Sequence, residues 1–357
     1  MARLHNFSAG PAAIPLEVLE ASAAGLSDYR GTGIGVPEMS HRSKAFIAIM
    51  DEAVAGVRDL LKVPADYEVL FLQGGATLQF AMLAMNLLKN RGDYVITGVW
   101  AEKAYSEAGA IGAVEAVASS KDARYSFIPK NFTQKDGSDY LHITSNNTVE
   151  GTQFRNYPRP PQGVPLVVDA SSDILSRPLD FTGVGLVYAG AQKNLGPSGV
   201  VLVILRKDLL ERNPRKLPEI LRYSAHAKAG SMLNTPPTFS VYMVKLVLDW
   251  IRKEGGVAEM EARARRKAGL IYNLIDEGGL YRGTAAREDR SLMNITFTLP
   301  SEELTEKFLK ESEKQGMEGL KGYRTVGGVR ASIYNAVPLA SVEALAQLMG
   351  DFSRKHG

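Results

Sequence analysis

The segment YAGAQKNLGPSGV (188–200) places a single lysine, Lys193, between two apolar runs. The run before it ends in Ala189, and the run after the Gly-Pro-Ser-Gly turn continues as VVLVIL (200–205). A lysine held in partly apolar surroundings has a lowered pKa and can form a Schiff base with a carbonyl compound. Taken alone, the pattern also fits a surface lysine in a loop, so it indicates a catalytic residue without establishing one.

Strand-like and helix-like segments alternate on both sides of this stretch. Six short segments predict strands: YEVLFL (67–72), DYVIT (93–97), YLHIT (140–144), LVVD (166–169), LVYA (186–189) and VVLVIL (200–205). Several are apolar throughout, which is typical of parallel strands that helices cover on both faces. After the first strand, Gly74-Gly75 opens a helical run over 76–90, whose apolar face at helical spacing is formed by Leu78, Met82, Met85 and Leu88. The predicted fold class is α/β, with a mainly parallel sheet covered by helices.

The character of the chain changes after Gly255-Gly256. The stretch 257–275 is charged, rich in alanine and helix-prone, and we interpret it as a connector. Beyond it, two strands and two helices of a small α+β unit are predicted over 293–299, 330–334, 301–315 and 341–355. We therefore expect a large domain over residues 16–256 and a small C-terminal domain over 257–357 that also includes residues 1–15.

Composition excludes several classes of protein. The 357 residues carry 42 Lys+Arg and 39 Asp+Glu, and a net charge of +3 is too weak a field to predict a nucleic-acid or membrane partner. The longest run of apolar residues and glycine (183–191) is far shorter than the roughly 18 residues of a membrane span. No cysteine is present, which excludes disulfides and thiolate chemistry and favours a reducing, cytoplasmic setting. The five histidines are scattered, so no metal site is predicted.

Asp169 is the second candidate for a catalytic residue. It ends the predicted strand of LVVDASSDIL (166–175), and ligands of open α/β sheets gather at the carboxyl ends of strands. An aspartate there can pair with a pyridinium nitrogen and keep it protonated, which makes pyridoxal phosphate an electron sink. Asp169 also fits a cap of the following turn, and Asp173 is a nearby competitor for either role.

Three further features could complete such a site. In LQGGATLQF (72–80), a glycine turn leads into a helix whose backbone N–H groups could bind a phosphate, although an ordinary tight turn fits as well. Trp100 could stack on a flat ring or belong to the core. Thr148, in SNNTVEG (145–151), is a possible hydrogen-bond partner or a plain loop hydroxyl.

Together these segments resemble the phosphoserine aminotransferases, a family of pyridoxal-phosphate enzymes of fold type I within the class V aminotransferases. The resemblance runs from SAGPA (8–12) to YNA (334–336) and is carried by GAQKNLGPSG, VVDASSDILSRP, QGGATLQF, TSNNTVEGTQF, NTPPTFSVYM and GGVRASIYNA. It implies a large domain built on a mainly parallel sheet of the seven-stranded type, with a small α+β C-terminal domain. It also implies a reversible ping-pong reaction of serine biosynthesis, in which phosphoserine and 2-oxoglutarate give 3-phosphohydroxypyruvate and glutamate.

The resemblance implies a role for each candidate toward pyridoxal 5′-phosphate. Lys193 would hold the cofactor as a Schiff base and move a proton between Cα and C4′. Asp169 would pair with the ring nitrogen, and Trp100 would stack on the ring. Thr148 would form a hydrogen bond with the cofactor on the side of the ring that carries the phenolic oxygen. The phosphate would lie on Ala76, Thr77 and Gln192. Asn234 and Thr235 would reach the phosphate from a neighbouring subunit, which implies a homodimer with shared active sites.

Substrate recognition would depend on arginines, because phosphoserine and glutamate each carry an α-carboxylate and a distal anion that Arg binds bidentately. Arg330 matches the α-carboxylate anchor of the family. The distal anion site would comprise His41, Arg42 and Arg324. Each arginine alone also fits a solvated surface charge. Where the family commonly has histidine, this chain has Tyr323, which can donate a hydrogen bond but adds no positive charge at neutral pH.

Other functions fit the sequence less well. A cysteine desulfurase needs a thiolate, and a serine–glyoxylate type enzyme has no use for a second anion site. A non-catalytic binding module would have no need of both Lys193 and Asp169. GPSG (196–199) is not the G-x-S-x-G elbow of a nucleophilic hydrolase. The use of 4-phosphohydroxythreonine, which leads to pyridoxine, stays open.

Overall fold

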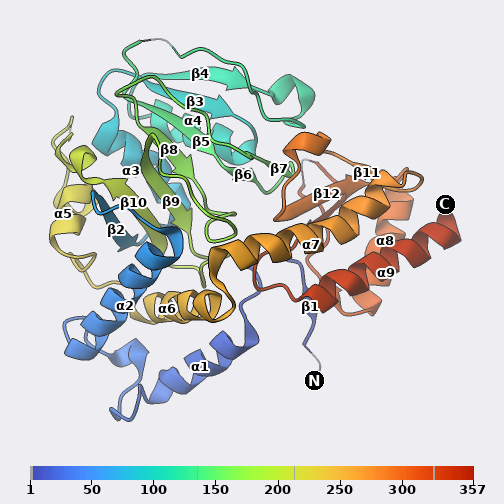
Figure 1. Cartoon of the computed structure of the whole chain (residues 1–357), viewed down its shortest axis with the longest axis horizontal. Coiled ribbons are helices and arrows are strands. Elements are labelled where there is room, and N and C mark those ends of the chain that lie inside the picture. The colour runs from blue at the N-terminus through green and yellow to red at the C-terminus, as the bar shows by residue number, and fades with distance from the viewer. Residues whose placement is uncertain (1–2, 135, 213, 325) are drawn as a thin grey trace.

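A seven-stranded sheet forms the centre of the larger part of the molecule in the computed structural model, which describes residues 3–134, 136–212, 214–324 and 326–357 (Figure 1). In spatial order its strands are β2 (Tyr67–Leu72), β10 (Val201–Arg206), β9 (Val184–Gly190), β8 (Leu166–Asp169), β5 (Tyr140–Thr144), β3 (Gly92–Ile96) and β4 (Val114–Ser119). β10 is antiparallel to both of its neighbours, whereas the pairs from β9 to β4 are all parallel. The predicted mainly parallel sheet is confirmed.

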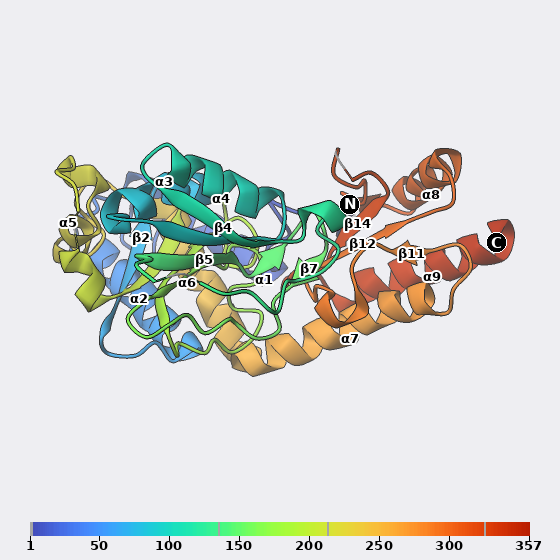
Figure 2. The ribbon, with the colours of Figure 1, turned by 90° about the horizontal axis from the view of Figure 1, so that it is seen from above.

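Helices cover this sheet on both faces, which is why β3, β5, β8 and β9 are buried along their whole length (Figure 2). One face packs against α3 (Gly75–Leu87) and α4 (Val99–Gly109), and the other against α2 (Lys44–Leu61) and α6 (Thr238–Lys253). Two further helices of this part are α1 (Leu16–Ser27) and the short α5 (Tyr223–Lys228). The sheet therefore has two apolar cores, one on each face.

Helix α3 is confirmed, but its predicted apolar face is wrong in part. Leu78 and Met85 are only half-buried, whereas the polar Gln79 and Asn86 are buried. Both polar side chains have partners: Tyr223 donates to Gln79 Oε1 at 2.6 Å, and Asn86 Nδ2 donates to the carbonyls of Met82 and Leu221, each at 2.8 Å. Hydrogen-bonded polar residues can replace apolar ones in a core, so apolar spacing alone misplaced the buried face.

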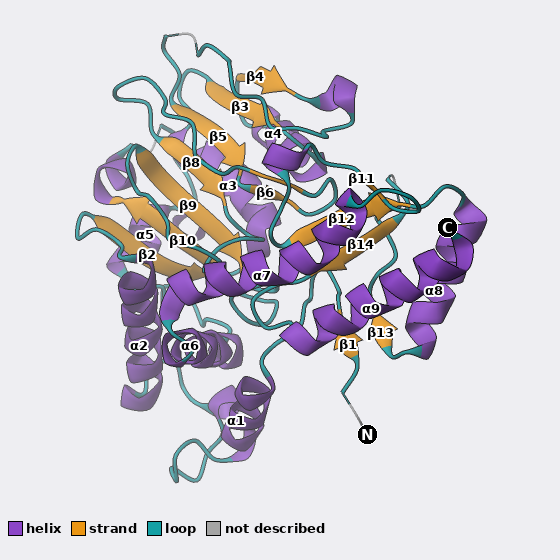
Figure 3. Cartoon of the chain, turned by 45° about the vertical axis from the view of Figure 1, so that its right-hand side comes forward, coloured by secondary structure: helices purple, strands orange, loops and turns teal. Residues whose placement is uncertain are grey.

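The C-terminal part of the chain forms a second, smaller layer (Figure 3). Its antiparallel sheet consists of β11 (Arg282–Gly283), β12 (Asn294–Thr298) and β14 (Val329–Ser332). The helices around it are α7 (Gly256–Asp276), α8 (Glu302–Lys314) and α9 (Leu339–His356). The N-terminal β1 (His5–Asn6) pairs with β13 (Met317–Glu318), and Phe7 and Ala13 belong to the same apolar cluster as this layer. A last small ladder joins β6 (Asn146–Asn147) and β7 (Thr152–Gln153).

Within the described parts of the chain, no helix combines the length and the apolar character that crossing a membrane requires. In the same residues, no group of three or more His, Cys, Asp or Glu side chains is placed to hold a metal ion. The division into residues 16–256 and residues 257–357 with 1–15 stays a prediction.

Phe308→Ala is expected to lower the free energy of unfolding by about 3–5 kcal/mol, the usual cost of deleting a buried phenylalanine ring. This ring is fully buried, and its centroid lies 6.1, 6.1 and 5.3 Å from those of Tyr281, Phe297 and Phe352. Phe127→Ala is the matched control, because Phe127 is 38% exposed and should cost much less. Urea denaturation followed by circular dichroism measures both variants. Equal losses would contradict a core role for Phe308.

Candidate active site

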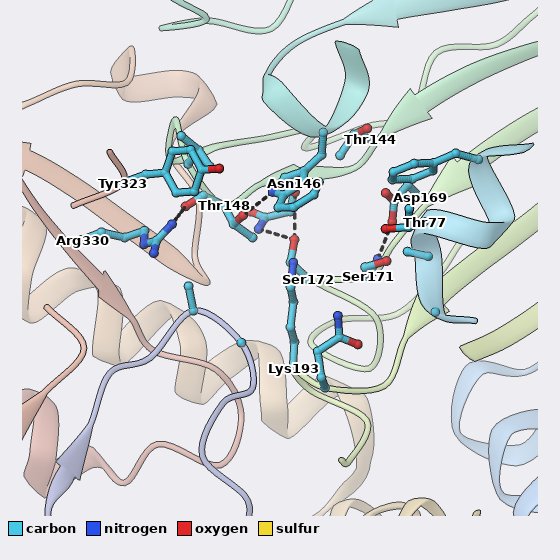
Figure 4. Close-up of a pocket in the computed structure, with 18 residues that line it drawn as sticks. Thr77, Thr144, Asn146, Thr148, Asp169, Ser171, Ser172, Lys193, Tyr323 and Arg330 are labelled. Atoms are coloured by element: carbon cyan, nitrogen blue, oxygen red, sulfur yellow. Dashed lines mark hydrogen bonds between the residues drawn. The ribbon is translucent and has the colours of Figure 1, made fainter. Parts of the chain in front are cut away.

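A cavity of about 290 Å³ opens where the carboxyl ends of β5 and β8 and the loop after β9 meet the first turns of α3 and α4 (Figure 4). Its wall includes many of the predicted site residues: Ala76, Thr77, Trp100, Thr148, Asp169, Gln192, Lys193 and Arg330. Arg330 comes from β14, so the two sheets meet at this cavity. The predicted cofactor residues of one chain are thus brought together, with one predicted substrate residue beside them.

Other predicted residues do not line this cavity as far as the described residues show: His41, Arg42, Asn234, Thr235 and Arg324. His41 and Arg42 lie in the turn between the 3₁₀ helix Val36–Glu38 and α2. Arg42, Asn234, Thr235 and Arg324 are exposed, and His41 is half-buried. Thr235 lies just before α6, where its carbonyl accepts a hydrogen bond from Gln73 Nε2 at 2.7 Å. The roles expected of these residues stay predictions.

Lys193 is held in a tight turn directly after β9. Its backbone N–H donates to the carbonyl of Ala191 at 2.7 Å, and the N–H of Gly196 donates to the same carbonyl at 2.8 Å. The side chain rises into the cavity, with Asp169 and Arg330 on opposite sides of it (Figure 4). Loss of hydration lowers the pKa of Lys193 to about 8, although the carboxylate of Asp169 opposes the shift. A large fraction of the amine is therefore neutral, and thus nucleophilic, slightly above neutral pH.

The N-terminal segment covers the stem of Lys193. Gly10 has a φ of +140°, and a Cβ atom there would lie 3.4 Å from Lys193 Cγ and 3.5 Å from Cε. The backbone conformation favours glycine, whereas these two distances are ordinary van der Waals contacts. The carbonyl of the preceding Ala9 accepts a hydrogen bond from the hydroxyl of Tyr334 at 2.8 Å. This contact fixes the covering segment to the small layer.

Asp169 both caps its own turn and faces the cavity. Its Oδ1 accepts the backbone N–H of Ser171 at 2.9 Å, and the residue is buried. Burial raises the pKa of Asp169, while the hydrogen bonds from Ser171 and the charge of Lys193 oppose the shift. The competitor Asp173 points elsewhere: it accepts from Ser145 and, at 3.1 Å, from Gln153 Nε2, and it does not line the described cavity. Of these two carboxylates, only Asp169 lines the described cavity.

The first turn of α3 presents backbone donors to the cavity. Gly74 and Gly75 have φ of +85° and +61°, and the helix has no side-chain cap. The N–H of Leu78 donates to the carbonyl of Gly74, so the N–H groups of Ala76 and Thr77 precede the first helical hydrogen bond. A Cβ atom on Gly74 would lie 2.4 Å from the Leu78 side chain, which explains this glycine. Such a turn binds anions, above all phosphates.

Thr148 connects the two sides of the cavity. Its Oγ1 accepts a hydrogen bond from Trp100 Nε1 at 3.1 Å, and its carbonyl accepts one from an Arg330 guanidinium nitrogen at 3.4 Å. The Nε of Arg330 is buried and has no hydrogen-bond partner within the described structure. The Tyr323 ring centroid lies 5.9 Å from the Arg330 guanidinium carbon. Arg330 therefore offers a free donor to a ligand.

Sequence reasoning missed part of the cavity wall, including Thr144, Asn146, Ser171 and Ser172. Asn146 Nδ2 donates to Ser172 Oγ at 2.8 Å and to Asn294 Oδ1 at 2.8 Å, which links the strand ends to the small sheet. All four follow or end a predicted strand at the carboxyl edge of the sheet. Their position at that edge is the signal that could have found them.

Comparison with known proteins agrees with this geometry. The family described as aminotransferase class-V matches residues 4–345 of the chain. The chain belongs to the class-V aminotransferases. Among the members of this family, the phosphoserine aminotransferase of Geobacillus kaustophilus (strain HTA426) is 54% identical over 360 residues, which is 99% of each chain.

Solved structures of related class-V aminotransferases share the fold. The phosphoserine aminotransferase from Bacillus circulans subsp. alkalophilus is 53% identical and superposes with a TM-score of 0.97 over 99% of both chains. The PLP-bound phosphoserine aminotransferase from Trichomonas vaginalis is 37% identical, with a TM-score of 0.93 over 98% of this chain and 100% of that one. The predicted fold type and family are therefore confirmed.

In cofactor-free protein, we expect the Lys193 amine to react with amine-specific reagents with a midpoint near pH 8, well below the value of about 10.4 of an ordinary lysine. Asp169→Asn should move the midpoint to lower pH, because it removes a charge that stabilises the ammonium form. Labelling rates across pH, with peptide mass spectrometry to isolate Lys193, measure both. A midpoint near 10.4, or an upward shift in the variant, would refute this description of the cavity.

Proposed function

We propose that this chain is a phosphoserine aminotransferase that binds pyridoxal 5′-phosphate in the cavity described above. Its reaction is the reversible ping-pong exchange of an amino group between O-phospho-L-serine and 2-oxoglutarate, which gives 3-phosphohydroxypyruvate and L-glutamate in serine biosynthesis. One observation carries the proposal. The Lys193 amine and the Asp169 carboxylate face one cavity whose wall includes an uncapped helix N-terminus.

The donor set of this cavity fits pyridoxal phosphate. Asp169 is a buried carboxylate suited to a protonated ring nitrogen, and Lys193 is an amine suited to the aldehyde. The phosphate would be held by the first turn of α3 and the neighbouring amide: Ala76, Thr77 and Gln192. Trp100 would lie against the ring, and Thr148 would bond on the side of the phenolic oxygen. When bound, the cofactor supplies an electron sink for the substrate's α-carbon.

The chain's own residues would supply binding and proton transfer. Arg330 would bind the α-carboxylate of each substrate, and its buried, unpartnered Nε supports this role. The amine of Lys193 would take the proton from the α-carbon and return it one step later, which its lowered pKa permits near neutral pH. Gly10 and the segment around it would exclude water from the Lys193 side chain.

We also propose a homodimer with shared active sites. Asn234 and Thr235 are exposed in the single chain and would reach the phosphate of a partner subunit. Half-buried Leu78 and 46%-exposed Ile220 line a second cavity of about 300 Å³ on the outer side of α3, together with Asn234. Apolar side chains left open in this way are typical of surfaces that a partner covers. His41, Arg42 and Arg324 would then form the site for the distal anion across the dimer.

The remaining parts of the proposal concern substrate range and location. 4-Phosphohydroxythreonine carries the same two anions as phosphoserine, so we include it as a second substrate, on the route to pyridoxine. Tyr323 faces Arg330 and would donate a hydrogen bond to a substrate phosphate without adding charge.

The enzyme would work in the cytoplasm, a proposal that the lack of cysteine supports. A small C-terminal domain, over 257–357 with 1–15, would carry Arg330 and Arg324 to the site.

A half-transamination screen tests the substrate class. Phosphoserine and glutamate should each convert the pyridoxal spectrum of the purified protein to the pyridoxamine spectrum, and alanine should do so far more slowly. Lys193→Ala should abolish the visible absorbance of the bonded cofactor. A colourless wild-type protein that takes up no cofactor would end the proposal.

Arg42→Ala should raise the KM for phosphoserine by about tenfold or more, because it removes charge-assisted hydrogen bonds of roughly 1.5–3 kcal/mol. The half-reaction with alanine, which has no distal anion, should change little. Arg30→Ala, another exposed arginine, is the control. Steady-state kinetics and spectral half-reactions measure the difference. An equal loss on both substrates would show that Arg42 has only a structural role.

A further inference from the structure

We propose that Glu150 is a positioning residue that fixes Trp100 against the cavity by anchoring the first turn of α4. Glu150 does not line the described cavity, and it was not among the residues that the sequence indicated. The proposal rests on the proposed function only in taking Trp100 as the residue that lies against the cofactor ring.

The carboxylate of Glu150 is buried, and only one of its two oxygens accepts a hydrogen bond from the described residues. The residue is 3% exposed. Its Oε1 accepts the backbone N–H of Val99 at 2.9 Å, whereas its Oε2 is buried with no hydrogen-bond partner in the part of the chain that the structure describes. Burying a carboxylate is costly, and this one has no ion pair within 4 Å among the described residues. Because burial of this carboxylate costs free energy, we expect Glu150 to fill a structural role.

Glu150 caps the N-terminus of α4. Val99 is the first helical residue, and the preceding Gly98 provides no side-chain cap. The N–H of Val99 would otherwise lack an intrahelical partner, and a negative charge is favourable at a helix N-terminus. A Cβ atom on Gly98 would lie 2.5 Å from Glu150 Oε2 and 2.8 Å from Asn147 Oδ1. Glycine at 98 therefore makes room for a cap that comes from a loop about fifty residues further along the chain.

One short turn thus contacts the helix end at two points. Glu150 accepts from the backbone of Val99, and Thr148 accepts from the indole of Trp100, the next residue. The turn itself is closed by the N–H of Gly151, which donates to the carbonyl of Asn147 at 2.9 Å. Two contacts on adjacent residues fix both the helix end and the orientation of the indole ring.

The same turn is attached to the small sheet. The carbonyl of Glu150 accepts from Thr296 Oγ1 at 3.0 Å and from Thr284 Oγ1 at 3.3 Å. Thr296 is the register partner of Arg330 in the β12–β14 pair. The backbone of Glu150 therefore ties the Trp100 side of the cavity to the strand beside Arg330. Burial raises the pKa of Glu150 to about 7, while the N–H of Val99 and the charge of Arg330 favour its ionised form.

Tryptophan fluorescence tests this proposal without relying on catalysis. The chain has two tryptophans, so Trp250→Phe leaves Trp100 as the only tryptophan, which can be excited selectively over the tyrosines. In that background and without cofactor, Glu150→Ala should shift Trp100 emission to longer wavelength and lower its anisotropy. Glu150→Gln should stay close to the parent, because its amide oxygen still accepts the Val99 N–H. Glu302→Ala, an exposed acid in the first turn of α8, is the control and should change neither signal.

Cofactor affinity gives a second readout in the same background. Glu150→Ala should weaken pyridoxal-phosphate binding by about tenfold, and Glu150→Gln should restore most of it.

Should Glu150→Ala fail to fold, Thr148→Val, which removes the hydrogen-bond acceptor of the Trp100 indole, should give the same emission change. Unchanged Trp100 emission and anisotropy in Glu150→Ala would overturn the proposal, as would equal loss in the Ala and Gln variants. If the parent protein fails to transaminate phosphoserine, the proposed function fails while the fluorescence result stands.

Discussion

The loss of water around the Lys193 amine and the Asp169 carboxylate is the constraint on which the site depends. Burial lowers the pKa of the amine and raises that of the carboxyl, while each charge partly stabilises the other across the cavity. An amine poised in this way is a nucleophile and a proton carrier at physiological pH. The fold must therefore bury these two groups beside one opening, and the parallel strand ends do so.

The two layers of the molecule contribute different parts of the site. The large sheet contributes Asp169 at the end of β8 and Lys193 after β9, and the helices on one of its faces contribute the glycine turn at the start of α3 and Trp100. The small layer contributes Arg330 from β14 and anchors the N-terminal segment over Lys193. The turn that carries Thr148 is hydrogen-bonded to both layers, so Trp100 and Arg330 share one support.

The sequence predicted most of this framework, and the physical reasons for its errors differ. Strands 67–72, 140–144 and 166–169 are predicted at their observed bounds, because buried strands leave short, mostly apolar runs in the sequence. The buried face of α3 was misplaced, because Gln79 and Asn86 are buried through hydrogen bonds that only the tertiary structure creates. Glu150 was missed for the same reason, since its partner is about fifty residues away in the chain.

Covalent trapping is the most direct test of the central claim, that the Lys193 amine bonds the cofactor opposite Asp169. The wild-type protein would be loaded with pyridoxal phosphate, reduced with borohydride and digested, and its peptides would be analysed by mass spectrometry. We expect a phosphopyridoxyl group on Lys193 and on no other lysine, and much less trapping in Asp169→Ala. Trapping on a different lysine, or none at all, would contradict it.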